Sequence, residues 1–137
     1  MSLNRLEWND EYSVGVLELD DQHKKMFAII NELLEAISSG HTEEHLDGIV
    51  DFLIKYKMFH FSTEEKYFKE FNYDGAEEHI AIHKQFNNKI DALRVKYPKY
   101  TNEFAFELVD FLEDWLIGHL LTTDHKYIKC FHYNGLK

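Results

Sequence analysis

The chain has 137 residues, the length of one domain, and its 45% hydrophobic and 15% aromatic content excludes a disordered protein. Its 15 basic and 25 acidic residues give a formal net charge of −10 at pH 7, which argues against binding to nucleic acids or anionic membranes. No segment approaches the ~20 apolar residues of a membrane span, no signal peptide is recognisable, and the single Cys130 cannot form an internal disulfide, so a cytoplasmic protein is expected.

The first residues predict an irregular arm followed by a helix. Residues 1–18 are expected to form the arm, and a helical repeat of apolar residues runs over 20–38. Asp20 or Asp21 is available as the N-cap of this helix, and Gly40 is available as its stop. The chain is therefore expected to enter its first helix from a short non-helical segment.

A second helix is predicted over 43–71. Thr42 is its expected N-cap, and acidic residues are frequent in its first turn, where they favour helix formation. The residues that follow, 72–75, read Asn-Tyr-Asp-Gly, which is typical of a turn. The short turn places the next helix antiparallel to this one.

The third predicted helix covers 75–97. Asp74, followed three residues later by Glu77, resembles a capping box at its start. The helix must end near residue 97, because Pro98 restricts the residue before it and lacks a backbone donor.

The last predicted helix covers 102–128 and begins at Thr101 or Asn102. No strand-like alternation of apolar and polar residues competes with the helical pattern anywhere in the chain. Four helices of similar length joined by short loops predict an all-α, up-down-up-down four-helix bundle, forming one domain over 1–137.

Histidine occurs in the apolar stripe of every predicted helix. Spacings of three and four residues place each stripe on one helical face, which normally packs into the core. The polar residues on these stripes or just beyond them are His23, His60, Glu64, His79, His83, His119 and Asp124. The other histidines, which are expected to be exposed, are His41, His45, His125 and His132.

The polar residues of the stripes are expected to lie at one level of the bundle. In antiparallel helices, positions at the same level mirror each other about the connecting loop. The mirror places His23 beside His60, and it places Glu64 opposite the segment 79–83. The same segment mirrors onto His119 of the last helix, so all four helices direct nitrogen or carboxylate groups into one layer.

A metal site explains such a layer best. Each buried polar group without a partner costs roughly 1–3 kcal/mol, and a domain has only ~5–15 kcal/mol of net stability. No Arg or Lys lies on these stripes near the layer to neutralise Glu64 and Asp124. Five imidazoles and two carboxylates exceed a four-coordinate zinc site and suit two octahedral ions that share bridging ligands. The donor chemistry alone leaves zinc, copper, iron and nickel open.

The spacings within the helices also point to shared ions. The pairs His60–Glu64 and His79–His83 are four residues apart, which directs two side chains toward one ion. His119 and Asp124 are five residues apart, about 140° from each other on a regular α-helix. We therefore predict a local π-type turn after His119, or a carboxylate that reaches sideways to bridge.

The constellation resembles the hemerythrin family, in particular its stand-alone bacterial members. The matching motifs are His23, His60-Phe61-x2-Glu64, His79-x3-His83 and His119-x4-Asp124, preceded by the segments Trp8-x3-Tyr12-x-Val14-Gly15-Val16 and Asp20-x-Gln22-His23. The resemblance covers nearly the whole chain, and all seven ligand positions are filled.

The resemblance implies a non-haem di-iron centre. By similarity, His79, His83 and His119 hold one iron, and His23 and His60 hold the other. The two carboxylates bridge both ions together with an oxo or hydroxo group. The first iron then has six ligands and the second has five, which leaves one position for dioxygen.

The resemblance also implies a dry pocket next to the open position, so that bound oxygen is not protonated and lost. The residues that match pocket positions of the family are Met26, Phe61, Trp115, Leu116 and Leu120. Tyr56 and Tyr67 are expected to donate hydrogen bonds toward the ligand residues.

The function implied by the resemblance is reversible dioxygen binding for storage, transport or delivery, rather than an enzymatic activity. The chain lacks the Glu-x-x-His motif of ferritin-like di-iron proteins, and its imidazole-rich donor set disfavours high-valent iron, so oxygen can leave intact. Two alternatives remain: sensing of oxygen, nitric oxide or redox state through a separate partner, and a di-iron oxidase or peroxidase activity. An oxygen acceptor or a reductant protein, as yet unidentified, is a further expected partner.

Overall fold

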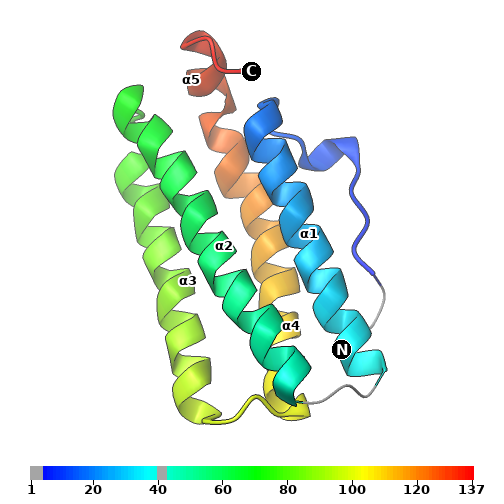
Figure 1. The fold of residues 1–137 in the computed structure, drawn as a ribbon. Coiled ribbons are helices and arrows are strands. Elements are labelled where there is room, and N and C mark those ends of the chain that lie inside the picture. The colour runs from blue at the N-terminus through cyan, green and yellow to red at the C-terminus, as the bar shows by residue number, and fades with distance from the viewer. Residues whose placement is uncertain (1–4, 40–42) are drawn as a thin grey trace.

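The protein is an all-α, up-down-up-down four-helix bundle, as predicted from its sequence (Figure 1). The computed structural model describes residues 5–39 and 43–137. Its long helices are α1 (Leu17–Ser38), α2 (Glu43–Glu70), α3 (Ala76–Lys96) and α4 (Asn102–Gly118). The shorter elements are η1 (Asp10–Tyr12), η2 (His119–Thr123), η3 (Asp124–Tyr127) and α5 (Ile128–Tyr133). No strand occurs in the described part of the chain.

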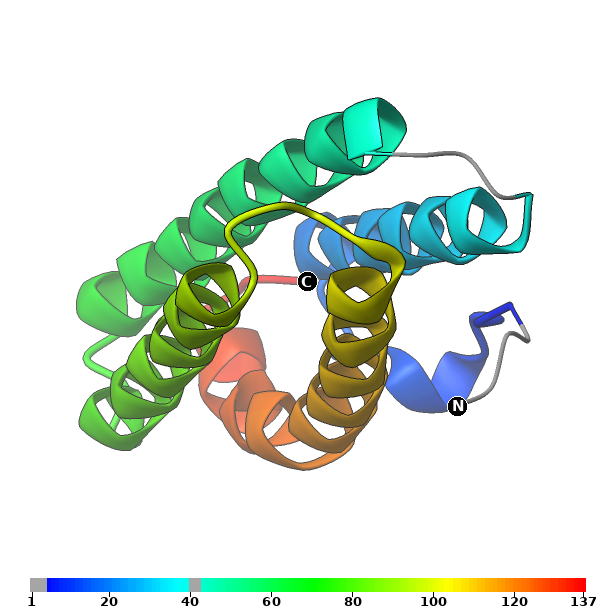
Figure 2. The same cartoon turned by 90° about the horizontal axis from the view of Figure 1, so that it is seen from below.

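The four long helices surround a common interior in the order α1, α2, α3, α4, and each contacts the next (Figure 2). The N-terminal arm lies outside this ring, where Trp8 and Tyr12 pack edge-on against Phe27 of α1 at ring-centroid distances of 5.5 and 5.2 Å. The buried apolar residues come from all four helices and from the arm, so one continuous core fills the bundle. Among the described residues, no helix is both long enough and apolar enough to cross a membrane.

The helix α1 begins at Leu17, three residues before the predicted start. Val16 is the N-cap, so neither Asp20 nor Asp21 caps α1, and that prediction is wrong. The Asp20 carboxylate instead accepts hydrogen bonds from the Ser13 hydroxyl at 2.5 Å and from the Val14 backbone N–H at 2.8 Å. The aspartate thus fixes the arm against the first turn of the helix.

The other helix ends follow the sequence signals in part. Thr101 caps α4 as predicted, because its side chain accepts a hydrogen bond from the Phe104 N–H. The predicted capping box at Asp74 is wrong: Gly75 is the N-cap of α3, without a side-chain hydrogen bond. The predicted stop at Gly40 and the predicted cap at Thr42 lie outside the described residues.

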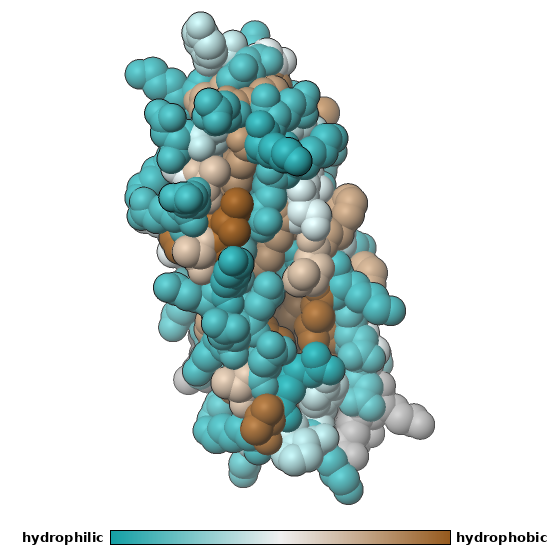
Figure 3. Space-filling view, turned by 90° about the vertical axis from the view of Figure 1, so that its left-hand side faces the viewer, coloured by the Kyte–Doolittle hydropathy of each residue, from teal (hydrophilic) through white to brown (hydrophobic). Residues whose placement is uncertain are grey.

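Most of the surface is hydrophilic. The face on the α3 side shows apolar residues only as separate patches, some of them in the grooves between helices (Figure 3). The large hydrophobic side chains exposed on the described residues are Leu17, Phe52, Met58, Phe59, Val95, Phe106, Leu121 and Tyr133.

Candidate metal centre

The seven polar residues singled out in the sequence lie together in the interior. α1 contributes His23, α2 contributes His60 and Glu64, and α3 contributes the pair at 79 and 83. The last two, at 119 and 124, come from the irregular segment that follows α4. All seven are buried, and the most exposed has only 7% of its surface accessible. The sequence analysis placed these residues at one level of the bundle from their distances to the connecting loops, and the structure brings them together there.

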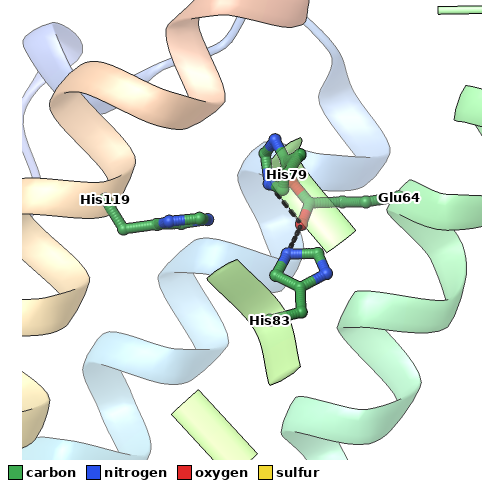
Figure 4. Close-up of side chains that lie close together, drawn as sticks. All are labelled: Glu64, His79, His83 and His119. Carbon is green, nitrogen blue, oxygen red and sulfur yellow. Dashed lines mark ion pairs between the residues drawn. The ribbon is translucent and has the colours of Figure 1, made fainter. Parts of the chain in front are cut away.

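Two carboxylates occupy the middle of this layer. One oxygen of Glu64 lies 3.2 Å from the Nε2 atom of His83 and 3.7 Å from that of His79 (Figure 4). The same oxygen lies 3.5 Å from the Nε2 atom of His60. Because these imidazoles come from two helices and point at one carboxylate, Glu64 has the position of a bridging ligand.

Asp124 is the second central carboxylate. Its Oδ1 atom lies 2.8 Å from His119 Nε2 and 3.2 Å from His79 Nε2, and its Oδ2 atom lies 3.1 Å from His23 Nε2. Its two oxygens thus face histidines on opposite sides of the layer.

The donors form two groups, each with its ligand atoms within 4.8 Å of one another. One group is Glu64, His79, His83 and His119; the other is His23, His60, Glu64 and Asp124. Glu64 belongs to both, which is the pattern expected for two neighbouring ions that share a carboxylate.

A π-helix brings His119 and Asp124 together, as predicted. The segment η2 is a π-helix, and the Asp124 N–H donates to the carbonyl of His119 five residues earlier. A π-turn contains more residues than an α-turn, so side chains five apart come onto one face. This local change of pitch is what aligns the carboxylate with the imidazole.

Many of the buried polar atoms make no hydrogen bond to any described residue. At least one nitrogen or oxygen atom is unsatisfied in each of His23, Glu64, His79, His83, His119 and Asp124. An unsatisfied buried polar group costs roughly 1–3 kcal/mol, so an empty layer would consume much of the stability of a domain. Imidazole nitrogens and carboxylate oxygens with free lone pairs are suitable ligands for divalent transition metals, and this donor set fits iron.

The electrostatic environment favours ionised carboxylates and, at two of the histidines, neutral imidazoles. Burial lowers the pKa of His60 to about 3 and also lowers the pKa of His119. Burial also acts to lower the pKa of His79, but the hydrogen bond with Asp124 and the charge of Glu64 outweigh it and raise that pKa. Burial raises the pKa of Glu64, but the surrounding histidines outweigh it and hold the pKa at about 2. The histidines around Asp124, His119 foremost, likewise outweigh burial and hold its pKa well below the usual value. Ionised carboxylates and neutral imidazoles are the protonation states that a metal ion requires of its ligands.

Two residues outside the layer orient two of its histidines. The Nδ1–H of His60 donates to Gln22 Oε1 at 2.6 Å, and the Nδ1–H of His83 donates to Glu65 Oε2 at 2.8 Å. Each bond places the proton on Nδ1 and leaves Nε2 free to face Glu64. The sequence analysis did not assign these roles, although each residue directly adjoins a predicted ligand in the sequence.

Tyr56 and Tyr67, which were predicted to donate hydrogen bonds toward the ligand residues, make other contacts. The Tyr67 hydroxyl donates to the Glu18 carboxylate, away from the layer, and the Tyr56 ring packs against Phe52 and Phe59. The prediction is wrong for both. The buried tyrosine near the centre is Tyr127, whose pKa burial raises well above its usual value, with Glu64 and Asp124 adding to the rise.

Aromatic and apolar side chains cover the layer. Phe61 stacks on His83 with a centroid distance of 3.7 Å, and Trp115 stacks on His119 at 4.1 Å. The predicted pocket residues Met26, Phe61, Leu116 and Leu120 are buried, and Trp115 is half-buried. Whether these residues line an oxygen pocket stays a prediction.

The apolar stripes carry no Arg or Lys near the layer, but a basic side chain that lies off the stripes is buried there. Lys57 of α2 is only 2% exposed, and the charges of Asp124 and Glu64 act on it. Lys57 was missed because it follows Tyr56 directly and is off the predicted apolar stripe.

The histidines outside the layer have surface roles. His45 and His132 are exposed as predicted, and the Nε2–H of His132 donates to the Gly15 carbonyl at 2.8 Å. His125 is half-buried rather than exposed, because its Nδ1–H donates to the Leu120 carbonyl at 2.6 Å. His41 lies outside the described residues. Cys130 is a free thiol, as predicted.

Comparison with known proteins gives consistent matches over most of the chain. A family model described as "Hemerythrin HHE cation binding domain" matches residues 14–131. A bacteriohemerythrin of Clostridium acetobutylicum is 30% identical over 125 residues, which are 88% of this chain and 97% of that protein. A bacteriohemerythrin of Pseudomonas aeruginosa is 28% identical over 90% of this chain and 79% of its own length.

A further relative and a solved structure agree with these matches. A hemerythrin-like protein of Naegleria gruberi is 32% identical over 88% of each chain. The crystal structure of a hemerythrin mutant with a leucine replaced by tyrosine superposes with a TM-score of 0.80 and 25% identity, covering 91% of this chain and 95% of that one.

Proposed function

We propose, from the premise that this chain belongs to the hemerythrin family, that it binds dioxygen reversibly at a non-haem di-iron centre, for oxygen storage, transport or delivery. The observation that carries the proposal is the buried layer in which five histidines surround Glu64 and Asp124. The same layer gives the chain its candidate metal-binding site, with donors supplied from all sides of the bundle.

The assignment of ligands follows the two donor groups. His79, His83 and His119 would hold one iron, and His23 and His60 would hold the other. The carboxylates would bridge them, together with an oxo or hydroxo group. When bound, the two irons supply the electrons and the coordination position that reversible oxygen binding requires.

The residues around the ligands determine how the centre is held. Gln22 and Glu65 keep a proton on the outer nitrogen of His60 and His83, so that the inner nitrogen faces the metals. Phe61 stacks on the imidazole of His83, and Trp115 stacks on that of His119. The stacking fixes the planes of both imidazole rings.

The apolar side chains that cover the layer would keep water away from the oxygen-binding position. Met26, Leu116 and Leu120 are at most 2% exposed and carry no hydrogen-bonding side-chain group that could hold water near the layer. A dry site limits proton transfer to bound oxygen, which favours its release unchanged. The sequence also contains no Glu-x-x-His motif. Together with these apolar side chains, this favours an oxygen carrier over a di-iron oxidase.

The test is repeated oxygenation of the iron-loaded protein. The chain is loaded anaerobically with Fe(II), two irons per chain are confirmed, and the visible absorption spectrum is followed while oxygen is added and removed several times. A spectral change that appears and disappears with oxygen supports a carrier. Irreversible oxidation after the first addition would favour a redox sensor or a di-iron oxidase or peroxidase, and failure to hold two irons would rule out the centre.

A further inference from the structure

Lys57 is a buried cation that the proposed ligand set does not use. Its Nζ atom lies 4.1 Å from the ring centroid of Trp115, 5.0 Å from that of Phe61 and 5.1 Å from that of Phe86. Three aromatic rings therefore enclose the ammonium, at distances typical of cation–π contacts. Within residues 5–39 and 43–137 it forms no ion pair with a carboxylate at contact distance.

Two of these rings also touch the metal centre. Phe61 lies nearly parallel to the His83 imidazole, with an angle of 12° between the rings, and Trp115 lies at 15° to His119. One face of each ring thus meets a proposed ligand, while the ring also meets the ammonium. Lys57 therefore contacts an aromatic ring that a proposed ligand also contacts, in two separate cases.

The charge on Lys57 is maintained in spite of its burial. Burial lowers its pKa to about 8, and the attraction of Asp124 and Glu64 limits the fall. The side chain is therefore mostly protonated at pH 7. A methionine would fill the same space without desolvating a charge, so simple packing does not explain the ammonium.

The other side of Lys57 faces the groove between α2 and α3. It contributes to a pocket of about 260 Å³, whose remaining lining includes Asn87, Asp91 and Arg94. The pocket opens on the molecular surface, but the ammonium itself is held inside the aromatic enclosure, where solvent screens its charge weakly.

We propose that Lys57 is a positioning residue of the metal centre: its ammonium, held behind Phe61 and Trp115, repels the metal cations and so raises the reduction potential of the iron pair. A positive charge in a poorly screened site destabilises Fe(III) more than Fe(II), because repulsion grows with the charge on the ion. Lys57 thereby favours the reduced protein, which is the form that takes up oxygen. The inference rests on the di-iron centre proposed above, but not on the reversibility of oxygen binding.

The test compares variants of the full-length iron protein in two measurements. The midpoint potential is determined by spectroelectrochemical titration at pH 7, and Fe(II) affinity is determined by competition with a chelator. Lys57→Met keeps the length of the side chain and removes its charge, so it should lower the midpoint potential and tighten Fe(II) binding, on the order of tenfold. Lys57→Arg keeps the charge and should stay closer to the wild type in both measurements.

The matched control is Lys66→Met, which removes an exposed lysine of the same helix that also lies over an aromatic ring. Solvent screens that charge, so neither measurement should change. If Lys57 were only structural, Lys57→Met would loosen the site and weaken Fe(II) binding, which is the opposite sign. That result, or effects no larger than those of Lys66→Met, would overturn the inference.

Two further outcomes are distinguishable. Circular dichroism checks that each variant is helical, and Lys57→Gln replaces Lys57→Met if the latter does not fold. A wild-type chain that fails to bind two irons would overturn the di-iron centre and this inference together. A wild-type chain that binds two irons but is oxidised irreversibly would overturn the carrier function while leaving the role of Lys57 to be decided by the two measurements.

Discussion

In two of the five histidines of the layer, His60 and His83, a side chain outside the layer determines which ring nitrogen carries the proton. Gln22 accepts from His60 and Glu65 accepts from His83, and both contacts leave Nε2 facing the central carboxylate. An imidazole without such a partner can rotate or adopt the other tautomer, which weakens metal binding. Gln22 and Glu65 therefore determine whether His60 and His83 direct Nε2 toward the central carboxylate.

Substitution of Gln22 tests this control. Gln22→Leu removes the acceptor for His60 while keeping a side chain of similar length, and we expect Fe(II) affinity to fall by about 10–100-fold. Competition with a chelator measures the change. The control is Gln85→Leu, an exposed glutamine of α3, which should bind iron like the wild type. Equal affinities in the two variants would show that Gln22 does not orient the ligand.

The buried histidines also predict how the metal-free chain responds to acid. His60 has a folded-state pKa of about 3, far below its ordinary value of 6.5, because it is buried. Between these values the unfolded chain binds a proton that the folded chain does not, so stability is present above pH 6.5 and declines as the pH falls. The lowered pKa of His119 acts in the same direction, while the raised pKa of His79 opposes it.

We therefore expect the urea midpoint of the metal-free chain to be lower at pH 5.5 than at pH 7.5. His60→Gln should flatten this dependence, whereas His45→Ala, which changes an exposed histidine, should preserve it. A midpoint that rises on acidification would contradict the assignment of His60 as a neutral buried imidazole.

At the scale of elements, the arm depends on one glycine. Gly15 has φ of +69°, a conformation that costs other residues about 1–2 kcal/mol. A Cβ added there would lie 2.7 Å from the His132 ring, which itself bonds to the Gly15 carbonyl. The arm and the C-terminal helix α5 therefore meet at a position where a side chain would strain the backbone and displace the His132 ring.

Gly15→Ala should accordingly destabilise the protein by about 1–2 kcal/mol or more in a urea titration. Gly48→Ala is the matched control, because an added Cβ at this position in α2 meets nothing within 4 Å. It should be neutral or stabilise the protein by up to about 1 kcal/mol, since alanine favours the helix. A Gly15 variant as stable as the Gly48 variant would show that the arm does not need this backbone geometry.

The elements that the sequence predicted best are those whose signals are local. Thr101 caps α4 because its side chain can reach the N–H of Phe104, and the five-residue spacing after His119 requires a π-turn. Asp20 was predicted as a cap because it precedes the helical repeat, but a tertiary contact with Ser13 and Val14 uses its carboxylate. Signals that compete with tertiary contacts could not be resolved from the sequence.

The candidate site could likewise be predicted where helix geometry determines it, but not where contacts between elements do. Six of the seven proposed ligands lie on helical stripes and Asp124 lies just beyond one, so their common level follows from helix geometry. Lys57 could not be predicted, because its burial depends on three rings that come from different helices. The roles of Gln22 and Glu65 depend in the same way on side-chain contacts between elements.

At the scale of the whole molecule, the metals are expected to hold the bundle together. The proposed ligands come from α1, α2, α3 and the segment after α4, so bound ions would cross-link all four sides of the interior. A ligand that binds only the folded state stabilises it, and the unsatisfied polar layer makes this gain large.

Iron loading should therefore raise the thermal unfolding midpoint, measured by circular dichroism with and without a chelator. His79→Ala removes a ligand between the two carboxylates, and we expect it to lose at least one iron and most of the rise. His45→Ala should retain both irons and the full rise. Loss of iron from the His45 variant with retention in the His79 variant would contradict the site.

The most direct measurement is the location of iron in a crystal of the loaded protein. An anomalous difference map recorded at the iron absorption edge should contain two peaks per chain, both between the carboxylates of Glu64 and Asp124, with one nearer His79, His83 and His119 and the other nearer His23 and His60. A single peak, or peaks away from these carboxylates, would contradict the account.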